Sequence, residues 1–260
     1  KPGDIAGTDR SGEIALWQRW NDYGIGLLRK RGAGELRQAE QAFERVSQLG
    51  LATGDLNLAR VYLREGRLDD AVIALRAAAA NKTPAPPWTI DYLTGLVNQQ
   101  NGFIEDAITN FSTVLATNYN DARRRGFDFG KDYRVRNQFA ESLFELARLE
   151  QSSSGPAAGN ELLRQAVAEY EITLSLDPEN TTAHYGLAQI YALLGDSKNE
   201  SHHRQLHAKY KPDDNARDLA VSTARRNSPA ANHAADDIVI YDLHRSLGDI
   251  MDNASSGLSD

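Results

Sequence analysis

The chain has 260 residues, of which 41% are hydrophobic, and its formal net charge is -7 at pH 7. This excess of acid argues against a general nucleic-acid binder, because phosphates must be neutralised by Lys and Arg. The sequence has no cysteine, which excludes disulfides, thiolate metal sites, a cysteine nucleophile and covalent haem attachment within the chain. No apolar run approaches the roughly 20 residues that a membrane-spanning helix needs.

Residues 1–12 form a lead-in that begins at Lys1 and carries no export signal of charged then apolar residues. We therefore expect that a signal or an upstream region was removed or is not included.

A helix-turn-helix pattern is clearest between Asn57 and Ala78. Apolar and small residues recur there at helical offsets on both sides of Gly66, so each half presents one apolar stripe. The glycine lies where a tight turn is needed. The stripe residues are Ala59, Tyr62, Ala71, Leu75 and Ala78. Neither short helix can bury its stripe alone, which predicts neighbours of the same kind.

The same pattern recurs along the chain. Gly102 matches Gly66 in the next copy, and an earlier copy contains Trp20, Gly24 and Phe43. A fourth copy is split by SSSGPAAGN and its flanks, and a fifth decays where Glu200 and Arg204 replace apolar residues. We expect repeats at about 16–49, 53–82, 88–118, 132–178 and 181–210 within one domain, 13–210, followed by an extension, 211–260. The polar last helix is typical of a capping repeat.

This pattern of Trp, Leu-Gly, Tyr, Gly, Ala, Phe, Ala and Pro resembles the tetratricopeptide repeat family over roughly residues 16–210. The resemblance implies an all-α, right-handed α-solenoid of about five helix pairs with a C-terminal extension. It also implies a concave surface that binds an extended peptide or a protein.

In repeats of this family the first helix of each pair lines the groove. Carried over to this chain, the groove positions are Asn21, Ile25, Arg29, Leu56, Arg60, Arg64, Tyr92, Leu96, Gln99, Arg134, Asn137, Glu141, Tyr185 and Gln189. A simpler alternative is that Asn21 and Asn137 only satisfy neighbouring helix ends. The subclass that clamps acidic chaperone tails is not indicated, because it needs Lys and Asn across three repeats, which Asn21 with Ile25 does not supply.

The segment DARRRGFDFGKDYRVR, 121–136, interleaves arginines with Phe127, Phe129 and Tyr133. Basic residues beside aromatic rings can hold an anion or a nucleobase, but nearby aspartates cancel half of the charge. A solvated linker between helix pairs is the favoured interpretation. The triplet Asp128-Phe129-Gly130 has no companion kinase motif.

Histidines gather on the last predicted helix, where His203 and His207 have the i, i+4 spacing of a metal-binding pair. Arg204 follows the first histidine where a zincin has Glu, so we expect no metal site. His184 occupies the position of the repeat's Trp, which predicts packing. Paired acids such as Asp69-Asp70 are expected to cap helix starts, and no hydrolase, phosphate-loop or dinucleotide motif is present.

After Tyr210 the repeat pattern stops. Asn215 to Arg226 is expected to form one more helix, and Ile238–Tyr241 is an apolar run that docks either on the solenoid or on a partner. The polar end of the chain is expected to be mobile.

The segments RWNDYGIGLL (19–28), AHYGLAQIYALLGD (183–196) and HRQLHAKYKPDDNA (203–216) look like the repeat region attached to bacterial multihaem c-type cytochromes. This second resemblance implies a periplasmic or extracellular location. Since the chain lacks every Cys-x-x-Cys-His site, we expect no cofactor in it, and any haem belongs to a partner or to an upstream region.

The sequence therefore predicts a protein-protein interaction scaffold and not an enzyme, with a multihaem cytochrome as a candidate partner. One alternative is an electron-transfer module in which His202, His203 or His233 reaches a partner's haem. Another is a glycan- or cell-envelope-binding accessory with Trp88, Tyr92 and Tyr185 as stacking platforms.

Overall fold

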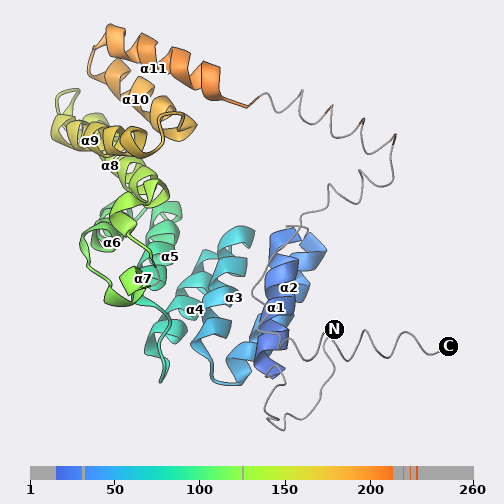
Figure 1. The fold of residues 1–260 in the computed structure, drawn as a ribbon. Helices are drawn as coiled ribbons and strands as arrows, with labels where there is room; N and C mark the ends of the chain where they lie inside the picture. The colour runs from blue at the N-terminus through green and yellow to red at the C-terminus, as the bar shows by residue number, and fades with distance from the viewer. Residues whose placement is uncertain are drawn as a thin grey trace. The chain divides into compact units, whose positions relative to one another are not determined.

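The computed structural model describes residues 16–30, 33–124 and 126–212, together with Leu219, Thr223 and Asn227. Within those ranges the regular structure is helical and contains no strand (Figure 1). The all-α fold class predicted from the sequence is confirmed. The lead-in 1–12, His233 and the apolar run 238–241 lie outside the described residues, as does most of the helix expected at 215–226. No helix in the described ranges is long and apolar enough to span a bilayer.

The described helices fall into two compact units that divide between Ala85 and Pro86, inside the single domain 13–210 predicted from the sequence. The first unit contains α1 (Leu16–Lys30), α2 (Ala33–Gln48), α3 (Ala52–Glu65) and α4 (Leu68–Ala80). Each helix packs against the next, and α1 also contacts α3 (Figure 1). The first helices of two successive pairs are therefore neighbours.

The turn between α3 and α4 depends on Gly66, as the sequence predicts. Gly66 has a φ of 72°, in the left-handed region that favours glycine. Its N–H donates to the carbonyl of Leu63 over 3.3 Å, and the N–H of Arg67 donates to the carbonyl of Tyr62 over 2.9 Å. These two bonds satisfy the last carbonyls of the helix and reverse the chain. Gly102, with a φ of 80°, does the same one repeat later.

Close helix contact in the first unit requires small residues opposite large ones. A Cβ atom on Gly24 of α1 would lie 2.7 Å from the ring of Phe43 of α2. Phe43 is fully buried, and burial of a side chain of this size contributes about 1.5–3 kcal/mol. The predicted stripe of Ala71, Leu75 and Ala78 is buried in the same way in α4.

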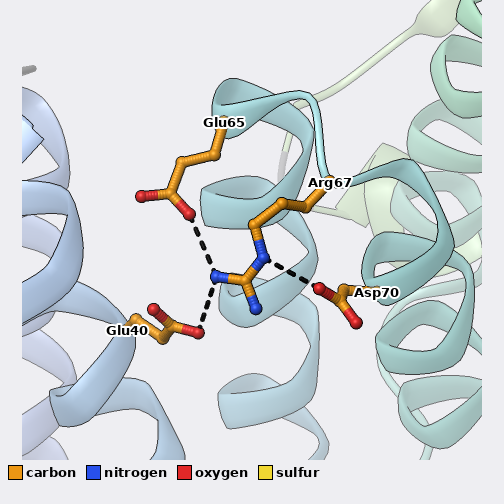
Figure 2. A network of polar contacts seen from close by, with 4 residues as sticks. All are labelled: Glu40, Glu65, Arg67 and Asp70. Atoms are coloured by element: carbon orange, nitrogen blue, oxygen red, sulfur yellow. Dashed lines mark hydrogen bonds and ion pairs between the residues drawn. The ribbon is translucent and has the colours of Figure 1, made fainter.

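A polar network around Arg67 joins three helices of the first unit (Figure 2). The Nη1 atom of Arg67 donates to Glu40 of α2 over 2.9 Å and to Glu65 of α3 over 3.1 Å, while Nε donates to Asp70 of α4 over 2.8 Å. The guanidinium carbon also lies 4.3 Å from the ring centre of Tyr62. These contacts fix α2 against the α3–α4 turn.

The second unit begins at Pro86 and contains longer connections. Its helices are α5 (Pro87–Gln100), α6 (Ile104–Ala116), α7 (Asn120–Arg124), the 3-10 helix η1 (Phe129–Lys131), α8 (Tyr133–Ser154), α9 (Asn160–Leu176), α10 (Thr181–Leu193) and α11 (Ser197–Tyr210). The insertion expected between the helices of the fourth repeat is largely helical, because α8 continues for 22 residues. Only 155–159 remain as the connection to α9.

Packing in the second unit follows the same rule until α11. One buried cluster joins α8, α9 and α10 through residues that include Leu143, Leu163 and Leu187. The other joins α6 to α8 through Phe111 and Val135. Helix α11 has no buried side chain, because Glu200 and Arg204 stand where the other repeats have apolar residues. Its contact with α10 therefore depends on polar and aromatic groups.

Candidate partner-binding surface

In the first unit, two predicted groove residues are linked by hydrogen bonds through a third residue. The Nη1 atom of Arg60 donates to the Oδ1 atom of Asn57 over 2.6 Å, and the Nδ2 atom of Asn57 donates to the Oδ1 atom of Asn21 over 2.8 Å. Asn57 was not among the predicted residues. Its spacing of 36 residues from Asn21 was the signal, since one repeat separates the two positions.

The remaining groove positions of the first unit differ in exposure. Arg64 donates to the carbonyl of Leu28 near the end of α1, Arg29 is exposed, and Ile25 is half-buried. Leu56 is only 6% exposed, so its side chain belongs to the helix packing and not to an open surface. Burial lowers the pKa of the Arg60 guanidinium.

In the second unit, the groove positions of α5 lie over a hydrophobic cluster. The rings of Tyr92 and Phe111 have centroids 6.0 Å apart, and Leu96 packs against the same cluster. Gln99 is half-buried. Burial, together with the charge of Asp132, raises the pKa of Tyr92, so its hydroxyl stays protonated at neutral pH. This part of the surface is apolar with a polar edge.

The groove positions of α8 behave in three ways. Arg134 is exposed and pairs with Asp132 over 3.3 Å. Asn137 is 6% exposed and donates to the Oδ1 atom of Asn180 over 3.1 Å, so it holds the start of α10, as the simpler alternative for Asn137 predicts. Partial burial and the neighbouring Glu145 raise the pKa of Glu141.

Tyr185 and Gln189 of α10 line a pocket of about 210 Å³ between α10 and α11. Ala188 and Ala192 of α10 also line it, and Arg204 and His207 contribute from α11. Tyr185 is 55% exposed, and its ring centroid lies 5.2 Å from that of His207. The hollow exists because Arg204 extends into solvent where other repeats have a buried aromatic or leucine side chain. The replacement of an apolar residue by Arg204 in the fifth repeat was therefore the sequence feature that could have predicted this pocket.

The segment 121–136 packs around an aromatic cluster. Trp88 contacts Tyr119 and Phe129 with ring centroids 5.4 and 6.1 Å away. Three arginines of the segment pair with carboxylates: Arg124 with Asp121, Arg134 with Asp132 and Arg136 with Glu169. These pairs favour a connecting role over an anion site.

Of the three aromatic residues considered as glycan platforms, Trp88 and Tyr92 pack against neighbouring rings. Tyr185 is the exposed one. The arrangement therefore gives one stacking ring and not a row of three.

Two histidines of the last helix, His203 and His207, face α10. The Nδ1 atom of His203 lies 3.0 Å from the Nδ1 atom of His184, and the Nδ1 atom of His207 lies 3.0 Å from the carbonyl of Thr181. His184 is 2% exposed, in agreement with the predicted packing role. In the described part of the chain, no cluster of three or more His, Cys, Asp or Glu side chains could hold a metal ion.

Paired helices with a glycine turn, packed in series through small and large residues, define an all-α helix-pair repeat protein. The family model described as "Tetratricopeptide repeat" matches residues 28–86 and 144–200. These residues are similar to tetratricopeptide repeats, in agreement with the first resemblance.

Solved structures share this fold. A crystal structure of the MamA protein has a TM-score of 0.53, with 16% identity, 75% of this chain and 91% of that chain covered. The structure of YrrB, titled "a TPR protein with an unusual peptide-binding site", has a TM-score of 0.53 with 16% identity, and covers 75% of this chain and 86% of that chain.

A curated relative is the "Cytochrome c-type biogenesis protein CycH" of Rhizobium meliloti (strain 1021), 33% identical over 113 residues. The match covers 43% of this chain and 29% of the relative, so the chain spans less than a third of that protein. The relative supports the cytochrome association that the second resemblance implied, and its name concerns the biogenesis of c-type cytochromes.

Proposed function

We propose that the chain is a scaffold that holds a segment of a partner protein on the first helices of its repeats. The observation that carries this proposal is the repeat architecture itself. Within each unit successive first helices are neighbours, and they present half-exposed polar and aromatic side chains that include Asn21 in the first unit and Tyr92 and Gln189 in the second. Repeat proteins of this kind use such extended surfaces for binding.

The partner that we propose is a c-type cytochrome, a multihaem cytochrome among the candidates, or a protein of its assembly. Support comes from the relative named for cytochrome c-type biogenesis and from the resemblance to repeat regions of multihaem cytochromes. In line with that resemblance, the proposal places the scaffold in the periplasm or outside the cell. Cell fractionation that finds the native chain only in the cytoplasm would contradict this location.

Binding of a purified c-type cytochrome, with and without haem, to the full chain tests the proposal. Tyr185 is the natural probe, since an exposed tyrosine supplies contact area at low entropic cost. We expect Tyr185→Ala to weaken binding by at least about five-fold, because tyrosines are often hot spots.

Tyr133→Ala is the matched control, because Tyr133 is also exposed, at 39%, but lies outside the groove positions. Equal loss in both variants would indicate a general effect and not a groove. A native mass measurement that finds the chain strictly monomeric beside these cytochromes would count against the scaffold.

A further inference from the structure

The connection between α6 and α8 is longer than the other connections between helix pairs. It spans 117–132 and contains α7 and η1, whereas 49–51 join α2 to α3 and 177–180 join α9 to α10. This connection encloses a hollow of about 220 Å³. The described lining residues come from the end of α6 and from the connection itself, so the hollow is separate from the predicted groove positions. Binding residues are often placed on connections that a rigid scaffold holds.

Aromatic rings form one wall of the hollow. Phe127 is 60% exposed, and its ring lies nearly parallel to that of Phe129, with the centroids 6.5 Å apart and an angle of 18° between the planes. Phe129 packs in turn against Trp88 and Tyr119, with ring centroids 6.1 and 5.9 Å away. The N–H of Phe127 donates to the carbonyl of Ala122 over 2.9 Å. The wall is therefore held in place, and its outer ring is open to a ligand.

Polar groups of opposite charge complete the hollow. Arg123 and Asp128 are the charged residues among the described lining residues. Each bonds to a neutral group: Arg123 donates to the Oδ1 atom of Asn118 over 3.1 Å, and Asp128 accepts from the N–H of Gly130 over 3.1 Å. A guanidinium has five N–H donors and a carboxylate has two acceptor oxygens, so the hollow offers both donors and an acceptor. Because the two charges cancel, the lining favours a neutral polar ligand over an anion or a cation.

We propose that this hollow, with Phe127 as its stacking ring, binds one pyranose ring of a neutral glycan whose hydroxyls are equatorial. Such a ring presents axial C–H groups over its face and hydroxyls around its edge. The C–H groups pack on the electron-rich face of the phenyl ring, and the hydroxyls, which both donate and accept, match Arg123 and Asp128. Pockets for drug-sized ligands measure roughly 300–1,000 Å³, so the smaller hollow has room for a single sugar ring. The inference goes beyond the proposed scaffold function and does not rest on it.

An aromatic side chain of a partner protein is the competing occupant. It would stack on Phe127 equally well. However, it would displace water from Arg123 and Asp128 without replacing the hydrogen bonds, which costs free energy. The polar groups of the lining therefore favour the sugar.

The test uses the full chain and two neutral trisaccharides, one of β-linked glucose and one of β-linked N-acetylglucosamine. Sorbitol is the comparison ligand, because it has the hydroxyls of a sugar but no ring face. In saturation-transfer NMR we expect at least one trisaccharide to bind at least about ten-fold more tightly than sorbitol, and added salt to leave the affinity unchanged because the ligand is neutral. Binding of both trisaccharides no tighter than that of sorbitol would overturn the inference.

Phe127→Ala locates the effect and is expected to reduce the affinity for the trisaccharide at least about ten-fold, because the stacking ring is lost. Phe103→Ala is the matched control, since Phe103 is 58% exposed in the same unit and lies outside the hollow. Unchanged affinity in Phe127→Ala, or an equal loss in both variants, would refute the assignment to the hollow.

The charged residues distinguish a neutral ligand from an ionic one. We expect Arg123→Gln and Asp128→Asn each to weaken binding of the trisaccharide at least about three-fold, because each removes a charge-assisted hydrogen bond. A gain in affinity in either variant would contradict a neutral ligand and overturn the inference. A peptide that alternates glycine with tryptophan represents the competing occupant. If it binds more tightly than both trisaccharides and loses that binding in Phe127→Ala, the hollow belongs to a protein side chain and the inference is wrong.

Discussion

The Nδ1 atoms of His184 and His203 lie 3.0 Å apart where α10 packs against α11. The Nε2 atom of His184 lies 3.0 Å from the carbonyl oxygen of Pro178, which can only accept, so Nε2 carries a hydrogen in the neutral ring. The Nδ1 atom of His184 is then an acceptor, and His203 donates to it. Protonation of both rings would place two N–H groups against each other.

This pair predicts that acid destabilises the last repeat. Burial, followed by the charges of His184 and His202, lowers the pKa of His203 to about 4, whereas an unfolded histidine has a pKa of about 6.5. Between these values the unfolded chain binds a proton that the folded chain does not, so the free energy of unfolding falls as the pH decreases from about 6.5 to about 4. The ring of Tyr191 stacks on His203, and the ring of Tyr210 stacks on His184.

Urea denaturation of the full chain at a series of pH values, followed by circular dichroism, measures this effect. His203→Gln is expected to flatten the dependence over this range. His202→Gln, at an exposed position of the same helix, is expected to keep most of it, because the charge of His202 is the smallest of the three causes. A dependence that survives His203→Gln unchanged would mean that other groups are responsible.

Two helical glycines predict opposite effects of the same substitution. A Cβ atom on Gly54 would lie 2.3 Å from the backbone nitrogen of Ser47, whereas a Cβ atom on Gly26 would meet no neighbour within 4 Å. We expect Gly54→Ala to destabilise the chain by about 1–3 kcal/mol or more, because backbone cannot move aside easily. We expect Gly26→Ala to stabilise it by about 0.5–1 kcal/mol through helix propensity. Thermal unfolding compares the two variants, and the same sign for both would contradict the packing.

The Arg67 network predicts a larger effect than an isolated surface pair. Arg67→Met removes the shared cation and leaves Glu40, Glu65 and Asp70 close together, so we expect a loss of about 1–2 kcal/mol. Arg164→Met is the control, because Arg164 and Glu161 are exposed by 65% and 73%, and the expected loss is below about 0.5 kcal/mol. Urea titration at low and high salt measures the free energy of unfolding of both variants. Equal losses in Arg67→Met and Arg164→Met would contradict the prediction.

Asn180 both caps the start of α10 and accepts a hydrogen bond from the buried amide of Asn137, so we expect its loss to disturb both. Its Oδ1 atom accepts from the N–H of Ala183 over 3.0 Å and from Asn137. Asn180→Ala removes the cap, at a cost of about 1–2 kcal/mol, and leaves the buried amide of Asn137 without its partner. Asn118→Ala, at an exposed loop position, is expected to be nearly neutral. Hydrogen exchange of the first turn of α10 should accelerate in the first variant alone.

The sequence by itself determined the class of fold, because the spacing of apolar residues and glycines along the chain is sufficient to predict helix pairs. The stripe of Ala71, Leu75 and Ala78, and the glycine turns at Gly66 and Gly102, depend on residues close in the chain, so periodicity and turn chemistry were sufficient. The insertion between the two helices of the fourth repeat was harder to predict, because the glutamine and serines of 151–154 do not show that α8 continues through them.

Only the tertiary structure decided which side chains remain available on each predicted face. Periodicity places Leu56 and Arg60 on nearby positions of α3, but contact with a neighbouring helix buries one and leaves the other partly open. The bonds between Asn21 and Asn57, and between His184 and His203, join positions 36 and 19 residues apart. Burial and hydrogen bonding are properties of pairs of helices, and the spacing within one helix does not contain them.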